Sequence, residues 1–268
     1  TKSTATIGGI VGYSYDSNLD FLLSNCTNNG PISYDSTCNN LRIGGVVGMA
    51  TGSNANKAQL DNLTNNRAIS VKRTMAGYVS CGGDGGYVLG SDTGSVNKLY
   101  NNGNISVKEG SVTGGFYCAG GIGQFKTGNA SYIYNRGNIN VDSDFFFTAT
   151  SIAGCIGHCE KSNNAMPTCQ HLYNYNPITV AGSSREGSKG LHRVGGTVGY
   201  SNMNLNNAYN EATGTITVSG NFNTNGNRQT TASDRGTDRF SIGGVVAYKA
   251  SVAVKDSSNK AAIIFSGT

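Results

Sequence analysis

Five cysteine and histidine residues lie close together in the sequence and raise the question of a metal site. They are Cys155, His158, Cys159, Cys169 and His171. Zinc uses such ligands, usually in pairs separated by about two to four residues. Here Cys169 and His171 are separated by a single residue, and Cys155 occupies an apolar position of a repeat. The sequence therefore predicts no metal site and no cofactor.

The acidic residues give little support for an enzyme. Glycoside hydrolysis typically needs two carboxylates facing one substrate. The candidate acids are Asp142, Asp144, Glu160, Glu186, Glu211, Asp234 and Asp238. Most of them fall in predicted loops rather than along one strand face. We therefore predict no catalytic residue, and a carbohydrate-active enzyme (a polysaccharide lyase or glycoside hydrolase) is the alternative hypothesis.

Four tyrosines occupy the same position of successive repeats and could form a binding surface. They are Tyr100, Tyr134, Tyr173 and Tyr209, each directly before a recurring asparagine. If the residue before each tyrosine points inward, the tyrosines point outward and stack. Such a strip could hold sugar rings or an apolar patch of a partner. Alternatively, the stacked rings only stabilise the repeat.

The seven cysteines suggest two cross-links. Cys81 and Cys118 occupy equivalent positions of adjacent units. Parallel neighbours about 4.8 Å apart could form a disulfide, or the two residues could be buried thiols. Cys159 and Cys169 bracket a loop and could close it. Because seven is odd, at least one cysteine is unpaired within the chain.

These residues are positioned by a recurring asparagine. It occurs at Asn28, Asn65, Asn101, Asn135, Asn174, Asn210 and Asn259, in steps of 34 to 49 residues. The residue two positions earlier is mostly apolar, and an isoleucine follows. Such a recurrence is typical of a repeat protein. At a tight corner, an asparagine can both donate to and accept from the asparagine of the next unit, and its backbone tolerates left-handed geometry. We therefore expect an asparagine ladder.

Each unit opens with a glycine-rich apolar phrase, and the units start near residues 7, 43, 81, 118, 152, 194 and 242. We expect three short strands per unit: the glycine phrase, a strand ending at the asparagine, and a strand starting at the isoleucine. The third alternates in polarity, as in Ile105-Ser106-Val107. One unit cannot form a core, but stacked units can. The sequence predicts an all-β, right-handed parallel β-helix (β-solenoid) of about seven coils, forming a single domain over residues 1–268.

The connections after the third strand lengthen late in the chain. The two longest are residues 181–193 and 219–241, and both leave the coil at the same corner. Loops on a rigid scaffold often carry function, although insertions are also tolerated there.

Composition agrees with short strands and limits the partners. Glycine accounts for 39 of 268 residues, and only 13% of residues are charged. The net charge of +5 is dispersed, which argues against nucleic-acid binding. No apolar stretch approaches about 18 residues, so we expect no membrane insertion of this segment.

The glycine phrases resemble the GLUG-motif repeats of bacterial surface proteins. They read IGGIVG at 7–12, IGGVVG at 43–48 and VGGTVG at 194–199, and the resemblance extends from residue 7 to residue 265. The units here are longer than that motif, and one phrase contains Asp84. The resemblance implies a secreted or cell-surface bacterial protein of adhesin type, and carries over no catalytic residue. We therefore expect an extracellular structural or adhesive module, part of a longer chain. It would bind a host or matrix glycan or protein through the tyrosine strip and the late loops.

Overall fold

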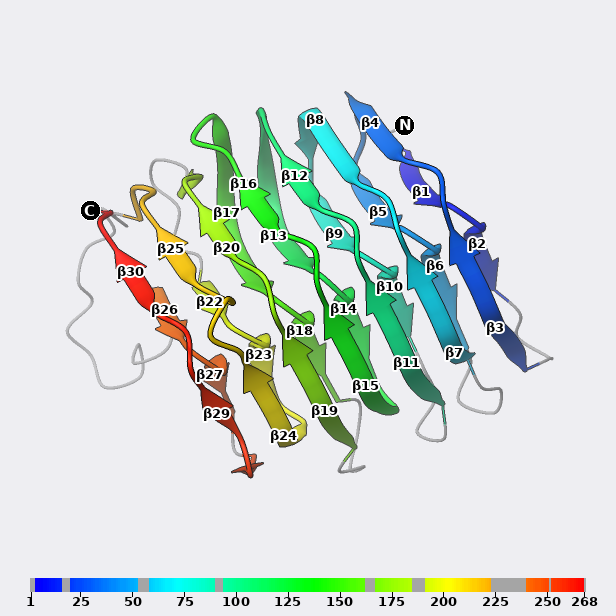
Figure 1. Cartoon of the computed structure of the whole chain (residues 1–268). Helices are drawn as coiled ribbons and strands as arrows, with labels where there is room; N and C mark the ends of the chain where they lie inside the picture. Colours follow the sequence, from blue (N-terminus) through cyan, green and yellow to red (C-terminus); the bar gives the residue numbers. More distant parts are fainter. Residues whose placement is uncertain are drawn as a thin grey trace, which may run out of the picture.

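The computed structural model describes residues 3–15, 20–52, 58–89, 94–161, 167–184, 191–222, 240–250 and 252–267. Its elements are β-strands that stack in parallel, turn upon turn, as Figure 1 shows. The chain is thus an all-β parallel β-solenoid. Five turns, from β5–β8 to β22–β25, lie between neighbours on both sides, and β1–β4 and β26–β30 form the two ends.

Each turn has four successive strands. The first strands are β1 (Thr4–Gly8), β5 (Asn40–Gly44), β9 (Tyr78–Gly82), β13 (Gly110–Ala119), β17 (Phe145–Ala153), β22 (His192–Gly195) and β26 (Phe240–Gly243). The second strands are β2 (Val11–Tyr15), β6 (Val47–Thr51), β10 (Gly85–Leu89), β14 (Ile122–Lys126), β18 (Ile156–Glu160), β23 (Val198–Ser201) and β27 (Val246–Lys249).

The third and fourth strands complete each turn. The third strands are β3 (Phe21–Asn28), β7 (Ala58–Asn65), β11 (Ser95–Asn101), β15 (Asn129–Asn135), β19 (Thr168–Asn174), β24 (Asn204–Asn210) and the short pair β28 (Val254–Lys255) and β29 (Ser258–Asn259). The fourth strands are β4 (Ile32–Thr37), β8 (Ile69–Ala76), β12 (Ile105–Val107), β16 (Ile139–Val141), β20 (Ile178–Val180), β25 (Ile216–Val218) and β30 (Ile263–Phe265). One further strand, β21 (Ser183–Ser184), pairs with β17.

The prediction of three strands per turn was wrong, because the glycine phrase holds two strands and a sharp corner. A Cβ atom at Gly45 would lie 2.0 Å from the carbonyl oxygen of Gly83. This position is glycine in every turn, because only glycine leaves room for the chain to turn this tightly. The position of Gly44, by contrast, is alanine in two turns, at Ala119 and Ala153. The phrase at residues 43–48 therefore ends β5 and starts β6 at an angle to it.

Equivalent strands pair in register along the solenoid. The second strands form a seven-stranded sheet and the third strands an eight-stranded sheet. The first and fourth strands belong to one 15-stranded sheet, because β8 also pairs with β13. Ile105 pairs with Ile139, which pairs with Ile178. Like side chains thus lie above one another, as the alternation predicted.

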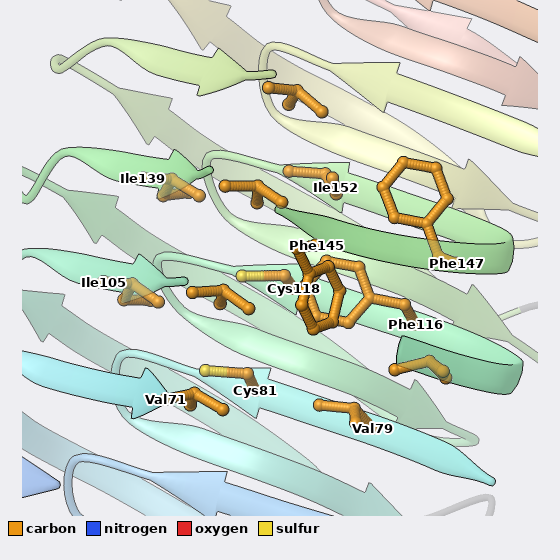
Figure 2. Packing of buried hydrophobic residues seen from close by; sticks show 14 of the residues in the cluster. Val71, Val79, Cys81, Ile105, Phe116, Cys118, Ile139, Phe145, Phe147 and Ile152 are labelled. Atoms are coloured by element: carbon orange, nitrogen blue, oxygen red, sulfur yellow. The ribbon is translucent and has the colours of Figure 1, made fainter. Parts of the chain in front are cut away.

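The interior is divided into two apolar cores. One lies between the first and fourth strands, and Figure 2 shows its aligned columns, including Cys81 beside Cys118 and the rings of Phe116, Phe145 and Phe147. The other lies between the second and third strands. In each turn, the first and second strands therefore form one layer, and the third and fourth strands form a second layer that faces it. Each layer bends between its two strands.

The asparagine ladder is confirmed and lies at the bend of the second layer. Each Nδ2 donates to Oδ1 of the asparagine in the next turn, at 2.7 to 2.9 Å. The same Nδ2 also donates to a nearby backbone carbonyl, as Asn101 does to Gly103 at 2.9 Å. The first six ladder residues are buried, whereas Asn259, at the end of the solenoid, is exposed.

The ladder asparagines do not use the left-handed backbone that asparagine tolerates. In every turn, the residue three positions earlier is left-handed instead, with φ between 48° and 57°, at Asn25, Asn62, Lys98, Tyr132, His171, Asn207 and Asp256. This residue interrupts the pairing of each third strand, as between Asn97 and Leu99. The strand bends there, and the ladder residue itself keeps ordinary geometry.

Candidate functional site

The four predicted tyrosines form one continuous stack, which we call the Tyr strip (Tyr100, Tyr134, Tyr173 and Tyr209). They come from β11, β15, β19 and β24, one turn apart. Ring centroids of successive members are 5.1, 5.0 and 5.2 Å apart, with interplanar angles of 3°, 4° and 26°. The preceding residues, such as Leu99 and Leu172, are fully buried. The tyrosines therefore point away from the core.

The aromatic surface widens around the middle of the strip. Tyr132 and His171, two positions before Tyr134 and Tyr173, stack at 4.5 Å. On the other side, Tyr175 lies 6.2 Å from Tyr173. The guanidinium of Arg136 lies 5.6 Å from the centre of the Tyr175 ring. These flanking residues were not predicted. Tyr132 and His171 lie on third strands, and Arg136 and Tyr175 directly follow the ladder asparagines.

The stacking determines what the strip can offer a ligand. Because the rings lie nearly parallel, the faces of Tyr134 and Tyr173 are covered by their neighbours on both sides. What points outward is a row of ring edges and hydroxyl groups. Burial, and then the neighbouring tyrosines, raise the pKa of Tyr134 and Tyr173, so both hydroxyls remain protonated donors at neutral pH. The strip can therefore make hydrogen bonds and edge contacts along its length.

Charged groups lie at one end of the strip. Lys260 Nζ is 2.9 Å from Glu211 Oε2, and Glu211 directly follows Asn210 of the ladder. The pKa of Lys260 is raised chiefly by its hydrogen bond to Glu211. The charges of Lys260 and Glu211 near Tyr209 therefore neutralise each other.

A second surface, missed by the sequence analysis, lies at the glycine corners. The outward side chains of the first and second strands converge there, since Arg42 lies over the Tyr87 ring at 4.4 Å and Tyr117 lies 4.6 Å from His158. They enclose a concavity of about 510 Å³, which we call the concave groove. Its lining residues are Asn40, Leu41, Arg42, Tyr78, Ser80, Tyr87, Tyr117, Gln124, Lys126, His158 and Glu160. The available signal was the recurrence of large polar residues on both sides of the glycine phrases.

The groove holds a small charged cluster. Glu160 Oε2 lies 3.0 Å from Lys126 Nζ and 3.8 Å from His158 Nε2. His158 first, and Lys126 second, lower the pKa of Glu160 to about 2. Burial lowers the pKa of His158 despite the carboxylate, so His158 is neutral at pH 7. Glu160 is the only carboxylate among the described lining residues, whereas two-carboxylate hydrolysis requires a pair.

The remaining predicted acids do not gather in this groove. Glu211 lies beside the Tyr strip, and Asp142 and Asp144 follow β16. Glu186, Asp234 and Asp238 lie outside the described residues. The arrangement of the described acids therefore adds nothing to the enzyme alternative.

The cysteines and histidines considered as metal ligands are separated by the strands. Cys155, Cys159 and Cys169 are fully buried in the core between the second and third strands. His158 points instead into the groove, and His171 points to the Tyr strip side. In the part of the chain that the structure describes, no group of three or more His, Cys, Asp or Glu is placed to hold a metal.

All seven cysteines are free thiols in this structure. Cys81 and Cys118 are direct partners in the β9–β13 pairing, and the contact with Cys81 is the first cause of the raised pKa of Cys118. The Sγ atoms of Cys159 and Cys169 are 3.2 Å apart, and Met203 Sδ lies 3.2 Å from the former. Both pairs are therefore adjacent, and their oxidation to disulfides stays a prediction.

The late loops are described only at their ends. Residues 185–190 and 223–239 lie outside the described residues. Where the second loop leaves the solenoid, Phe222 packs into the core, 4.3 Å from Phe240 and 5.8 Å from Phe147. The role of these loops in binding stays a prediction.

In the described residues, no helix has the length and apolar character required to cross a membrane. The chain matches no family model, no curated protein and no solved structure. The β-solenoid repeat is therefore established by the structure itself, and the resemblance to GLUG repeats has no support from a family match.

Proposed function

We propose that this chain is an extracellular adhesive repeat module that binds a host or matrix ligand through the Tyr strip. The observation that carries the proposal is the continuous stack of four tyrosines on one outer face. Each ring is fixed by its neighbours and by the buried ladder residue that follows it. Rigid tyrosines lose little conformational entropy on binding and are enriched among the residues that dominate interfaces.

The orientation of the rings favours a protein ligand over a glycan. A sugar gains most by lying flat on an open aromatic face. In the strip, the inner faces are covered, and hydroxyls and ring edges point outward. Such a row fits a surface that offers backbone acceptors and apolar side chains. Tyr132 and Tyr175 widen the contact on both sides.

The location is part of the same proposal. A long ladder with repeated glycine phrases suits a rigid spacer that displays a surface away from its anchor. We propose a secreted or cell-surface bacterial protein related to GLUG-type repeats, in which this module is joined to other domains. The late loops, which leave the solenoid from one edge, are proposed as additional contacts.

The test compares two pairs of stacked tyrosines. Tyr134→Ser with Tyr173→Ser removes the middle of the strip. Tyr13→Ser with Tyr15→Ser removes a pair that stacks at 6.5 Å on β2 and is more than half exposed. Each protein is immobilised and probed with purified extracellular-matrix proteins and a glycan array, after thermal unfolding shows that it is folded.

We expect the wild type to bind at least one matrix protein, the Tyr134/Tyr173 variant to bind it at least about tenfold more weakly, and the Tyr13/Tyr15 variant to match the wild type. Equal binding by all three proteins would refute the role of the strip. Binding to glycans alone would refute the protein ligand, and no binding to any probe would contradict the adhesive function.

A further inference from the structure

The concave groove has the dimensions of a ligand site. Its volume of about 510 Å³ lies in the range of small-molecule pockets. It runs along the solenoid axis, from Arg42 on β5 to Glu160 on β18, and so crosses four turns. At a spacing of about 4.8 Å per turn, the groove is roughly 15 Å long. A groove of this shape suits a short linear oligomer better than a compact small molecule.

The wall of the groove carries tyrosines laid over glycine. A Cβ atom at Gly114 would lie 2.8 Å from Cζ of Tyr78, and one at Gly115 would lie 2.5 Å from the hydroxyl oxygen of Tyr117. Because Gly114 and Gly115 have no side chain, both tyrosine rings can lie against the backbone. Unlike the inner members of the Tyr strip, Tyr78 is 54% exposed and has no ring stacked on it among the described residues. It offers a free aromatic surface for a sugar ring.

Between the aromatic residues lie hydrogen-bonding groups. Ser80 Oγ is 3.4 Å from Gln124 Oε1, and the two come from opposite sides of the glycine corner. Lys126 and Glu160 are each more than a third exposed at their side chains. Donors and acceptors thus alternate with rings along the groove, which is the lining expected for a molecule with many hydroxyl groups.

The charge of the groove is positive. Glu160 is already balanced by Lys126 at 3.0 Å. Arg42 lies over Tyr87, and no carboxylate pairs with it in the described ranges. A guanidinium of this kind is suited to a carboxylate.

We propose that the concave groove binds an acidic oligosaccharide, with a sugar ring on Tyr78, a carboxylate at Arg42, and hydroxyl groups at Gln124 and Glu160. The site is distinct from the Tyr strip, because it lies on the first and second strands while the strip lies on the third. Its ligand is also distinct, because the groove presents an open ring at Tyr78 and, at Arg42, a cation that hydrogen bonds to Met49 Sδ but has no carboxylate partner in the described residues. The proposal therefore stands independently of the function proposed for the strip.

The experiment uses the whole chain and two soluble probes. One is a short oligomer of uronic acids, and the other is the same oligomer with its carboxyl groups reduced to alcohols. Binding is measured by calorimetry for the wild type, Arg42→Gln and Tyr78→Ala. The controls are Arg67→Gln, whose exposed side chain lies outside the groove and hydrogen bonds to Asn29, and the Tyr134/Tyr173 variant of the strip.

We expect the uronic acid oligomer to bind the wild type, and to bind Arg42→Gln and Tyr78→Ala at least about tenfold more weakly. The two controls should match the wild type, and added salt should weaken binding. The reduced oligomer should bind the wild type at least about tenfold more weakly than the acid. Equal binding of both oligomers would overturn the choice of an acidic ligand. Full binding by the two groove variants, or no binding by folded wild type, would overturn the site.

Discussion

Asn101 and Gly83 pack directly against each other, although they are 18 positions apart in the sequence. A Cβ atom at Gly83 would lie 2.3 Å from Cγ of Asn101 and 1.8 Å from the carbonyl oxygen of Gly120. The same contact recurs in every turn, at 2.1 to 2.7 Å from the ladder Cγ. The glycine corner of one layer therefore packs directly against the asparagine corner of the other layer in every turn.

Replacing Gly83 with alanine should destabilise the protein by at least about 3 kcal/mol, because neither backbone nor ladder can give way. The measurement is urea-induced unfolding followed by far-UV circular dichroism. Gly30→Ala is the control, since Gly30 is exposed and the nearest atom to its added Cβ would be 3.7 Å away. The control should change the free energy of unfolding by no more than about 0.5 kcal/mol. Similar effects at both positions would contradict this packing.

Replacing Asn135 with aspartate should cost about 3–5 kcal/mol at pH 7, because a carboxylate cannot donate to Asn174 and is buried without compensation. Asn102→Asp is the matched control. Asn102 Nδ2 donates to Asn66 Oδ1 at 2.9 Å in a similar but exposed pair. Its loss should cost less than about 1 kcal/mol. Part of the Asn135→Asp deficit should return on acidification, and a pH-independent deficit would argue against the buried charge.

The buried Asp84 side chain should lower the stability of the folded protein. It is fully buried, and both of its carboxyl oxygens lack a hydrogen-bond partner within the described structure. Burial raises its pKa well above the usual range, and the Asn65 backbone opposes this only in part. The folded state thus binds a proton that the unfolded state releases, so stability falls as pH rises above about 4.

Asp84→Val, which copies Val46 of the preceding turn, should therefore stabilise the protein at pH 7 by about 1–3 kcal/mol. Asp84→Asn removes the charge but keeps the polarity, so it should remove the pH dependence and gain less stability. The stability and its pH dependence are measured for both variants by urea unfolding at pH 5 and pH 8. A wild type more stable than Asp84→Val at pH 8 would show that the carboxylate has a partner that stabilises it.

His192 should make stability depend on pH in the opposite direction. Both of its ring nitrogens are buried without a partner in the described structure, between Phe147 at 5.3 Å and Phe222 at 5.6 Å. Burial, and then Arg193, lower its pKa to about 4. Between pH 6.5 and pH 4 the unfolded state binds the proton and the folded state does not, so stability is lost as pH falls.

His192→Phe, which matches Phe240 in the next turn, should remove this loss. The difference in free energy of unfolding between variant and wild type should grow by about 3 kcal/mol from pH 7 to pH 4. His158 contributes its own slope to both proteins and cancels in the difference. A constant difference across this range would contradict the assignment.

The repeated positions were predictable because each carries a physical requirement that one residue type meets. The ladder needs an amide that both donates and accepts, and the alternation of Ile105, Ser106 and Val107 places two apolar side chains in the core. The strand count was not predictable by alternation. In the phrase at 43–48, the chain changes direction between β5 and β6, and the glycines interrupt the alternation of polar and apolar residues there. The corner also depends on a contact with a neighbouring turn, which the sequence does not show.

The groove was missed for a related reason. Arg42 and Tyr87 belong to different turns, and Ser80 and Gln124 also come from neighbouring turns, on opposite sides of a glycine corner. Only the angle at that corner brings such pairs together, and no spacing in the sequence records the angle. The Tyr strip, by contrast, lies along a single row, so its stacking followed from the repeat. What did not follow is that stacking covers the ring faces.

The asparagine ladder also has a direction. All six amide hydrogen bonds run the same way, from Asn28 through to Asn259. The amide dipoles therefore add along the axis, as peptide dipoles do in a helix. The column carries partial negative charge toward the Asn28 oxygen and partial positive charge toward the Asn259 amide. The column of side-chain amides is therefore polar along the solenoid axis, and a further asparagine could extend it only with its oxygen toward Asn259 or its amide nitrogen toward Asn28.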